Sequence, residues 1–97
     1  MVNLQIIAVG KLKEKWLSDG CAEYQKRMGA YCRVQLLELE ESRLPQEPSP
    51  AQIEAALRAE GVRILEKAKG GRLIALCIEG KHLSSEELSH MLSHCAV

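Results

Sequence analysis

The sequence predicts an α/β fold in which a parallel sheet is covered by helices, giving three layers in the chain order βαβαβα. Three apolar runs support this prediction, near residues 4–9, 33–40 and 72–78. Amphipathic segments separate them, and strands that alternate with helices are joined by right-handed crossovers into a parallel sheet. All 97 residues fit a single domain.

The first strand and helix follow from residues 4–31. The run from Leu4 to Val9 is apolar except for one glutamine, and Gly10 ends it. The next segment carries apolar residues at helical spacing, which predicts an inward-facing stripe: Leu17, Cys21, Tyr24, Met28 and Tyr31. The two tyrosines are expected to be core or half-buried anchors, and stacking on nucleic-acid bases is the alternative.

The second strand and helix are marked by clear boundaries. Arg33 to Glu40 is the strand, and a loop rich in proline and acidic residues follows it. Ser49, Pro50 and Gln52 supply an N-cap, a proline at the first helical position and a capping-box partner. The helix should run to about Lys69, where the next two residues are glycines that stop it.

The third strand organises the predicted ligand site. Leu73 to Ile78 is apolar without polar alternation, which suits a strand buried on both faces. The polar loop Glu79-Gly80-Lys81 follows, and Ser84 begins a helix with Glu87 at capping-box spacing. Ligands bind beyond the carboxyl ends of parallel strands. We therefore expect Leu76 to be buried near this edge and the loop to face a ligand.

Lysines follow two of the predicted strands. Lys11 comes after the first strand and Lys81 after the third, and Lys13 and Lys15 lie close to the former. Because both strands should end at one sheet edge, these four lysines would form a positive rim suited to phosphates. The alternative is that they are ordinary solvated lysines. There is no glycine-rich dinucleotide fingerprint and no Walker loop.

Charge and metal-ligand spacing exclude some other functions. Thirteen basic and thirteen acidic residues cancel, which argues against a purely electrostatic nucleic-acid binder. Glu86, His90 and His94 recur at four-residue spacing, but a solvated polar face is favoured over a metal site. We predict no metal, and no catalytic residue is identified from the local sequence.

The cysteines and the amino terminus point to a cytosolic protein. The four cysteines contain no Cys-x-x-Cys pair and are expected to be reduced and mostly buried: Cys21, Cys32, Cys77 and Cys95. The first residues lack the basic lead of a signal peptide. No apolar run approaches the roughly 20 residues that span a bilayer. We therefore expect a cytoplasmic protein without a membrane segment.

Three stretches together resemble the ribosomal RNA large-subunit methyltransferase H family. The first is residues 7–13, reading IAVGKLK, with Glu23-Tyr24 and Lys26-Arg27 after it. The second is Glu60-Gly61 with residues 63–65, and the third is residues 74–81, reading IALCIEGK, followed by residues 84–87, reading SSEE. They occur in order over nearly the whole chain.

This resemblance implies an enzyme of the SPOUT superfamily that uses S-adenosylmethionine to methylate N3 of a pseudouridine in large-subunit (23S) ribosomal RNA. It implies a homodimer that acts on the assembled ribosome. It also implies an α/β fold whose carboxyl-terminal part forms a knot that holds the cofactor. On this resemblance Leu76, Glu79 and Gly80 would contribute to the cofactor pocket.

The chain is shorter than members of that family. It resembles their amino-terminal part, so we expect residues 1–97 to form a single, truncated domain without the knot. Such a chain should be inactive alone. A non-catalytic α/β binding or interaction module is the alternative function.

Overall fold

The computed structural model describes residues 2–95, which form two strands and three helices. Their order along the chain is β1 (Val2–Val9), α1 (Lys15–Met28), β2 (Cys32–Leu39), α2 (Pro50–Lys67) and α3 (Ser85–Cys95). The predicted alternation of strands and helices is confirmed over the first four elements. Both strands start and end within two residues of the predicted bounds.

The two strands pair in parallel over their full length. Val2 lies opposite Cys32 and Val9 lies opposite Leu39. The ladder continues for one residue, because the amide of Gly10 donates a 2.8 Å hydrogen bond to the carbonyl of Leu39. The sheet therefore ends abruptly at the carboxyl ends of both strands, where the two connecting segments leave it together.

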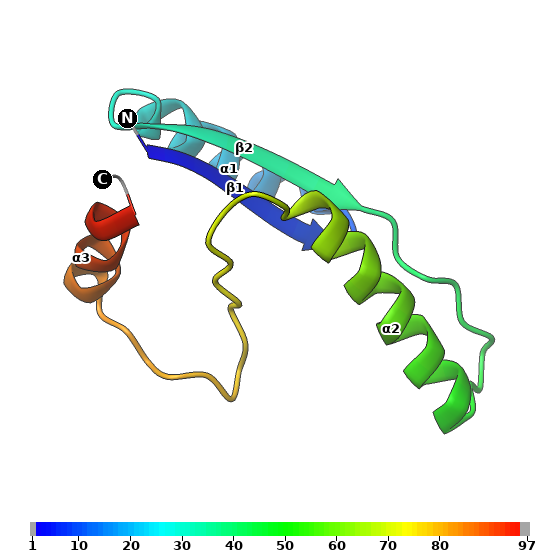
Figure 1. Cartoon of the computed structure of the whole chain (residues 1–97). Coiled ribbons are helices and arrows are strands. Elements are labelled where there is room, and N and C mark those ends of the chain that lie inside the picture. Colours follow the sequence, from blue (N-terminus) through cyan, green and yellow to red (C-terminus); the bar gives the residue numbers. More distant parts are fainter. Residues whose placement is uncertain (1, 96–97) are drawn as a thin grey trace.

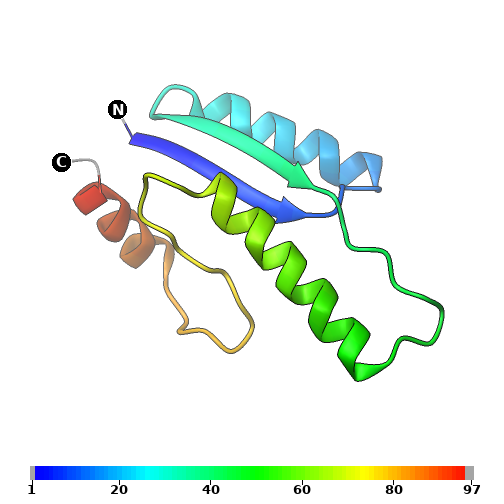
Figure 2. The same ribbon diagram turned by 45° about the vertical axis from the view of Figure 1, so that its right-hand side comes forward.

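Helices lie on both sides of the strand pair. Figure 1 shows α1 behind the strands and α2 in front of them, and α3 lies near their amino-terminal ends. Figure 2 gives the same arrangement from another side, with the strands between α1 and the other two helices. Helix α1 contacts β2, whereas α2 and α3 contact β1. This three-layer order matches the predicted fold class.

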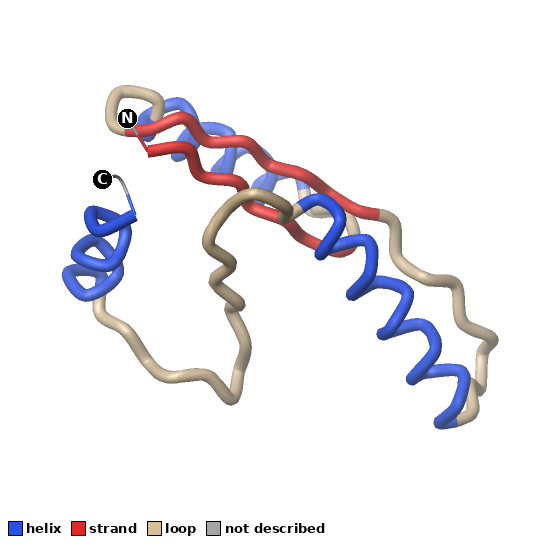
Figure 3. Tube along the Cα trace, in the orientation of Figure 1, coloured by secondary structure: helices blue, strands red, loops and turns tan. Residues whose placement is uncertain are grey.

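The third predicted strand is not formed. Residues 72–77 have no regular structure, and the described part of the chain contains a two-stranded sheet. Figure 3 shows residues 72–84 as a loop that passes away from the strands and returns to α3. A strand buried on both faces needs a covering layer on each face. Helix α2 extends beyond the strands and α3 lies at their other end, so neither covers this segment (Figure 2).

Both predicted capping boxes are present. At α2 the amide of Gln52 donates to Ser49 Oγ at 3.2 Å, and the amide of Ser49 donates to Gln52 Oε1 at 2.8 Å. At α3 the corresponding pairs between Ser84 and Glu87 are both 3.1 Å. Each box satisfies two amide groups that the helix geometry leaves without a partner. These two helix starts were therefore set by local sequence.

Little of the chain is buried. Among described residues Cys32 is the buried hydrophobic residue, with 6% of its surface exposed. The accessible surface is 8638 Å², whereas a compact monomer of this mass, 10.8 kDa, should expose about 5,500 Å². The radius of gyration is 15.8 Å, against about 12.5 Å for a compact domain of this length. The fold thus presents a large surface that its own elements do not cover.

The expected core residues of α1 are mostly exposed. Tyr24 and Tyr31 are 67% and 81% exposed, so the prediction that they are core or half-buried anchors is wrong. The side of α1 near β2 instead carries Ala22 and Gln25. The Nε2 atom of Gln25 donates a 3.3 Å hydrogen bond to the carbonyl of Val34. The centre of the predicted stripe lies about 80° from Gln25 and about 140° from Ala22 around the helix, since each helical residue rotates by about 100°. The stripe therefore lies to one side of the contact with β2, and its residues are exposed.

The thiols also differ from expectation. Cys32 is buried, as predicted, because it lies at the start of β2 under α1. Cys21, on α1, and Cys77, in the segment that does not form the third strand, are both exposed. The side chain of Cys95 lies outside the described side chains.

Candidate nucleic-acid interface and ligand edge

The lysine connection, residues 10–15 between β1 and the first turn of α1, carries three of the four predicted lysines. Lys11 and Lys13 lie in the connection, and Lys15 is the first residue of α1. All three are exposed. They lie at the carboxyl end of β1, where the sequence placed them. The first turn of α1 has no side-chain cap and no acidic residue, so its amide groups add positive potential beside the lysines.

Carboxylates also lie at this edge. Glu38 Oε2 accepts a 3.0 Å hydrogen bond from the amide of Leu12, in the middle of the lysine connection. Glu41 lies close to Gly10, whose φ of +95° is one that favours glycine. The edge is therefore a mixed one, in which exposed lysines lie beside exposed carboxylates, including Glu14 within the connection, and Glu38 is bound to the backbone. Glu38 is not among the residues predicted from the sequence, although parallel pairing of the two strands places it opposite Ala8, two residues before Gly10.

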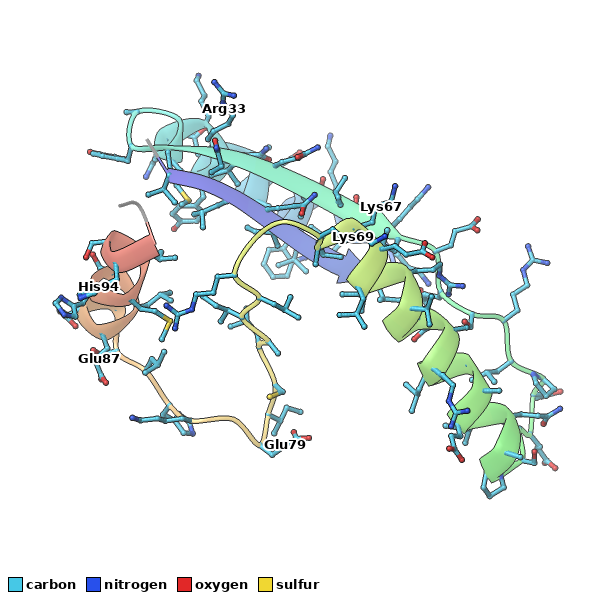
Figure 4. The ribbon with its side chains drawn as sticks, viewed as in Figure 1. Arg33, Lys67, Lys69, Glu79, Glu87 and His94 are labelled. Carbon is cyan, nitrogen blue, oxygen red and sulfur yellow. The ribbon has the colours of Figure 1, made fainter. Side chains whose placement is uncertain are left out.

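Lys81 is not brought to the lysine connection. Its predicted place depended on the third strand, which is not formed. Figure 4 shows Glu79 at the tip of the long loop, away from the strand pair, whereas Lys67 and Lys69 lie beside it. The four-lysine rim therefore reduces to Lys11, Lys13 and Lys15, with Lys81 on a separate segment.

The predicted cofactor residues lie on this same loop. Glu79 and Gly80 form a turn, as expected, in which the amide of Gly80 donates to the carbonyl of Cys77 at 3.1 Å. Leu76 is 92% exposed, so its predicted burial is wrong. Ile78 is fully exposed. Because a small-molecule site buries most of its ligand, these residues do not by themselves fit S-adenosylmethionine.

A polar clamp of Ser42, Glu60 and Arg63 joins the end of β2 to α2. Arg63 Nη2 donates to Ser42 Oγ at 2.9 Å and to the carbonyl of Glu40 at 3.1 Å. The amide of Ser42 donates to Glu60 Oε2 at 2.8 Å, and its hydroxyl donates to the carbonyl of Ala56 at 3.3 Å. This clamp is not predicted from the sequence. The pattern in the sequence that could indicate it is a glutamate and an arginine three residues apart, because such residues are neighbours on a helix surface.

All aromatic side chains of the chain belong to the α1 region and are exposed. Trp16 is 70% exposed, and the guanidinium of Arg27 lies 5.8 Å from the ring centre of Tyr24. Exposed aromatic rings beside basic groups are suited to stacking on unpaired bases. The stacking alternative for the tyrosines is therefore compatible with the structure, whereas the core alternative is not.

The histidines of α3 do not form a metal cluster. His94 Nδ1 lies 2.9 Å from the carbonyl of His90, and their ring centres are 4.6 Å apart. Across residues 2–95 no group of three or more His, Cys, Asp or Glu side chains is placed to hold a metal ion.

Across the same residues no helix has the length and apolar character needed to cross a membrane.

Comparison with known proteins identifies the family. The profile of a family described as "Predicted SPOUT methyltransferase" matches residues 2–97. The chain belongs to the SPOUT methyltransferase family. The alternating strand and helix order and the parallel strand pair of this SPOUT chain agree with the α/β fold expected from the resemblance.

Several curated relatives carry the name "Ribosomal RNA large subunit methyltransferase H". The protein from Ligilactobacillus salivarius is 48% identical over 94% of this chain and 58% of its own length. The protein from Carboxydothermus hydrogenoformans is 43% identical over 95% of the chain, and one from Bacillus cereus is 45% identical over 98%. This SPOUT chain spans 58–60% of the length of these relatives. The resemblance found in the sequence is thus confirmed.

Proposed function

We propose that this chain is the amino-terminal part of an S-adenosylmethionine-dependent methyltransferase that modifies N3 of a pseudouridine in large-subunit rRNA. The observation that carries the proposal is 43–48% identity over at least 94% of the chain to relatives named as large-subunit rRNA methyltransferases. The structure contributes a compatible feature, an exposed group of lysines beside exposed aromatic rings on α1.

Within this function, residues 10–15 are the RNA-facing segment. Lys11, Lys13 and Lys15 would contact phosphates, and Lys81 would provide a second contact from its own loop. Contacts to phosphates position a protein without reading sequence. A neutral overall charge does not prevent this role, because the lysine side chains are exposed while Glu38 is engaged with the backbone. Selection of the target base would then come from other contacts.

The cofactor would be held by a pocket to which Leu76, Glu79 and Gly80 contribute one wall. What supports this is the exposure of Leu76 and Ile78, which gives a further segment an apolar surface to cover. The single domain of residues 1–97 would be completed by that segment, and the completed protein would act in the cytoplasm as a homodimer on the assembled ribosome. Strand formation at 72–78 would accompany completion, since both faces would then be covered.

A chimera tests the function directly. The chain is fused to the remaining carboxyl-terminal part of the Ligilactobacillus salivarius relative, and methyl transfer from labelled S-adenosylmethionine is measured on purified large ribosomal subunits. The relative itself is the positive control, and circular dichroism checks that the chimera is folded. Label should enter rRNA with the chimera and not with the chain alone.

The target base is tested with large subunits whose rRNA lacks pseudouridine. Label should then fall to background with both the chimera and the relative. Incorporation that persists on these subunits would contradict the pseudouridine assignment. A folded chimera that binds cofactor and rRNA but transfers no methyl group would instead favour a non-catalytic binding module.

A further inference from the structure

We propose that Glu38 is a positioning residue for the RNA-facing segment: it fixes the backbone of the lysine connection so that Lys11 and Lys13 are presented together. This inference rests on the proposed rRNA-binding function. On this proposal Glu38 favours RNA binding by ordering the lysine connection, although its negative charge by itself repels RNA phosphates.

The first observation is the hydrogen bond between Glu38 and Leu12. The carboxylate accepts from the Leu12 amide at 3.0 Å across 26 residues of sequence. Leu12 stands between Lys11 and Lys13, so this one contact orients the peptide unit that joins the first lysine to the rest of the connection. No side chain caps the α1 start that follows, which leaves Glu38 as the side chain that holds this segment in the described structure.

The second observation concerns Gly10, where the connection leaves β1. Its φ is +95°, and a Cβ built there would lie 2.9 Å from Glu41 Oε1. Its amide is bound to the carbonyl of Leu39 at 2.8 Å. The end of β2 therefore contacts the connection at both Gly10 and Leu12. These contacts direct the connection across the carboxyl end of β2.

The third observation is that the end of β2 is itself anchored. The polar clamp joins Glu40 and Ser42 to Arg63 and Glu60 of α2. Glu38 lies two residues before Glu40 and opposite Ala8 in the strand ladder. Its backbone is thus held on both sides, and its exposed carboxylate reaches the Leu12 amide from this anchored backbone.

The two effects of Glu38 predict opposite results. If Glu38 acted only through its charge, its removal beside three lysines would strengthen RNA binding. If it positions the connection, its removal should weaken binding, because the lysine segment must then be ordered when RNA binds. The sign of the change therefore distinguishes the two.

The experiment compares Glu38→Ala, Glu38→Gln and Glu40→Ala in the 97-residue chain. Binding is measured with a fluorescein-labelled rRNA hairpin containing pseudouridine. Glu38→Gln removes the charge but keeps an acceptor oxygen. Glu40→Ala removes the same charge from an exposed residue two positions after Glu38. Arg63 binds the backbone carbonyl of Glu40 and not its carboxylate, so this contact is kept in the variant. We expect Glu38→Ala to weaken binding roughly two- to tenfold, the size of one lost hydrogen bond, with the other two variants equal to wild type or tighter.

Amide hydrogen exchange at Leu12 gives a readout that needs no RNA. Exchange should accelerate roughly two- to tenfold in Glu38→Ala and stay near the wild-type rate in the other variants. Unchanged exchange in Glu38→Ala overturns the positioning role, as does tighter RNA binding in that variant. If no variant binds the hairpin, the proposed function of the segment fails, and the exchange result still decides whether Glu38 holds the connection.

Discussion

The guanidinium of Arg63 on α2 is joined to the hydroxyl of Ser42, 21 residues earlier, by a 2.9 Å hydrogen bond. Its Nη2 atom makes this bond and also donates to the carbonyl of Glu40. Arg63 Nε is buried without a partner among the described residues. One side chain thus ties α2 to the end of β2. In a chain with so little core, such a tie is expected to matter more than an exposed ion pair.

Replacing Arg63 by alanine should lower the free energy of unfolding by about 1–3 kcal/mol, because Ser42 and the carbonyl of Glu40 lose their donor. Urea denaturation followed by circular dichroism measures this. Arg58→Ala, the same change on the same helix, is the control: its exposed pair with Glu54 should contribute about 0–0.5 kcal/mol. Equal losses in the two variants would show that the clamp has no special role.

Ser49→Ala should destabilise the chain by about 0.5–2 kcal/mol, because the capping box at the start of α2 is lost. The expected signal is loss of helical circular dichroism at lower urea concentrations. Ser89→Ala, within α3, supplies the matched control. If Ser49→Ala and Ser89→Ala unfolded at the same urea concentration, the box would not stabilise α2.

The chain alone should self-associate through residues 72–78. Leu76 and Ile78 are 92% and 100% exposed, β1 has one free edge, and unpaired edges pair readily with other chains. Sedimentation velocity should therefore show association that Leu76→Lys with Ile78→Lys reduces. Val62→Lys, an exposed apolar position outside the segment, should leave it unchanged. A wild-type chain that stays monomeric at high concentration contradicts this prediction.

The chain alone should not bind S-adenosylmethionine measurably, since the side chains of Leu76 and Ile78 face solvent and enclose nothing. Isothermal titration calorimetry of the chain and of the chimera makes the comparison. Heat of binding is expected with the chimera only. Micromolar binding by a monodisperse chain would place the cofactor site elsewhere in residues 1–97.

Neutralising lysines should change the salt dependence of RNA binding. Each of Lys11→Gln, Lys13→Gln and Lys15→Gln should reduce the slope of log K against log salt by about one if that lysine contacts a phosphate. Lys26→Gln, on α1 beyond the connection, is the comparison. Slopes that stay at the wild-type value in all three variants would show that these lysines are only solvated.

Local sequence was sufficient to predict the elements whose boundaries depend on short-range contacts. The capping boxes at Ser49 and Ser84 were correct, because each involves residues three apart. The prediction of a strand over residues 72–78 rests on hydrophobicity alone. That property describes a tendency to be buried, and burial requires other elements that cover the segment, which are not supplied here.

The candidate site shows the same distinction. Lys11, Lys13 and Lys15 were placed correctly because they follow β1 directly. Lys81 was not, since its position depended on the third strand. Glu38 and Arg63 were missed because their partners are 26 and 21 residues away. Contacts at that distance follow from strand register and helix packing, which periodicity does not specify.

Because Cys32 is buried beneath α1, the reaction rate of its thiol depends on how often the native chain opens. Cys21 and Cys77 are exposed and should react with a thiol reagent at the rate of a free cysteine, whereas Cys32, at 6% exposure, can react only when α1 separates from β2 or the chain unfolds. The labelling rate of this one thiol therefore measures how often the β1–α1–β2 unit opens in the native state. A binding partner that stabilises the unit would be detected as slower labelling at Cys32, with no added probe.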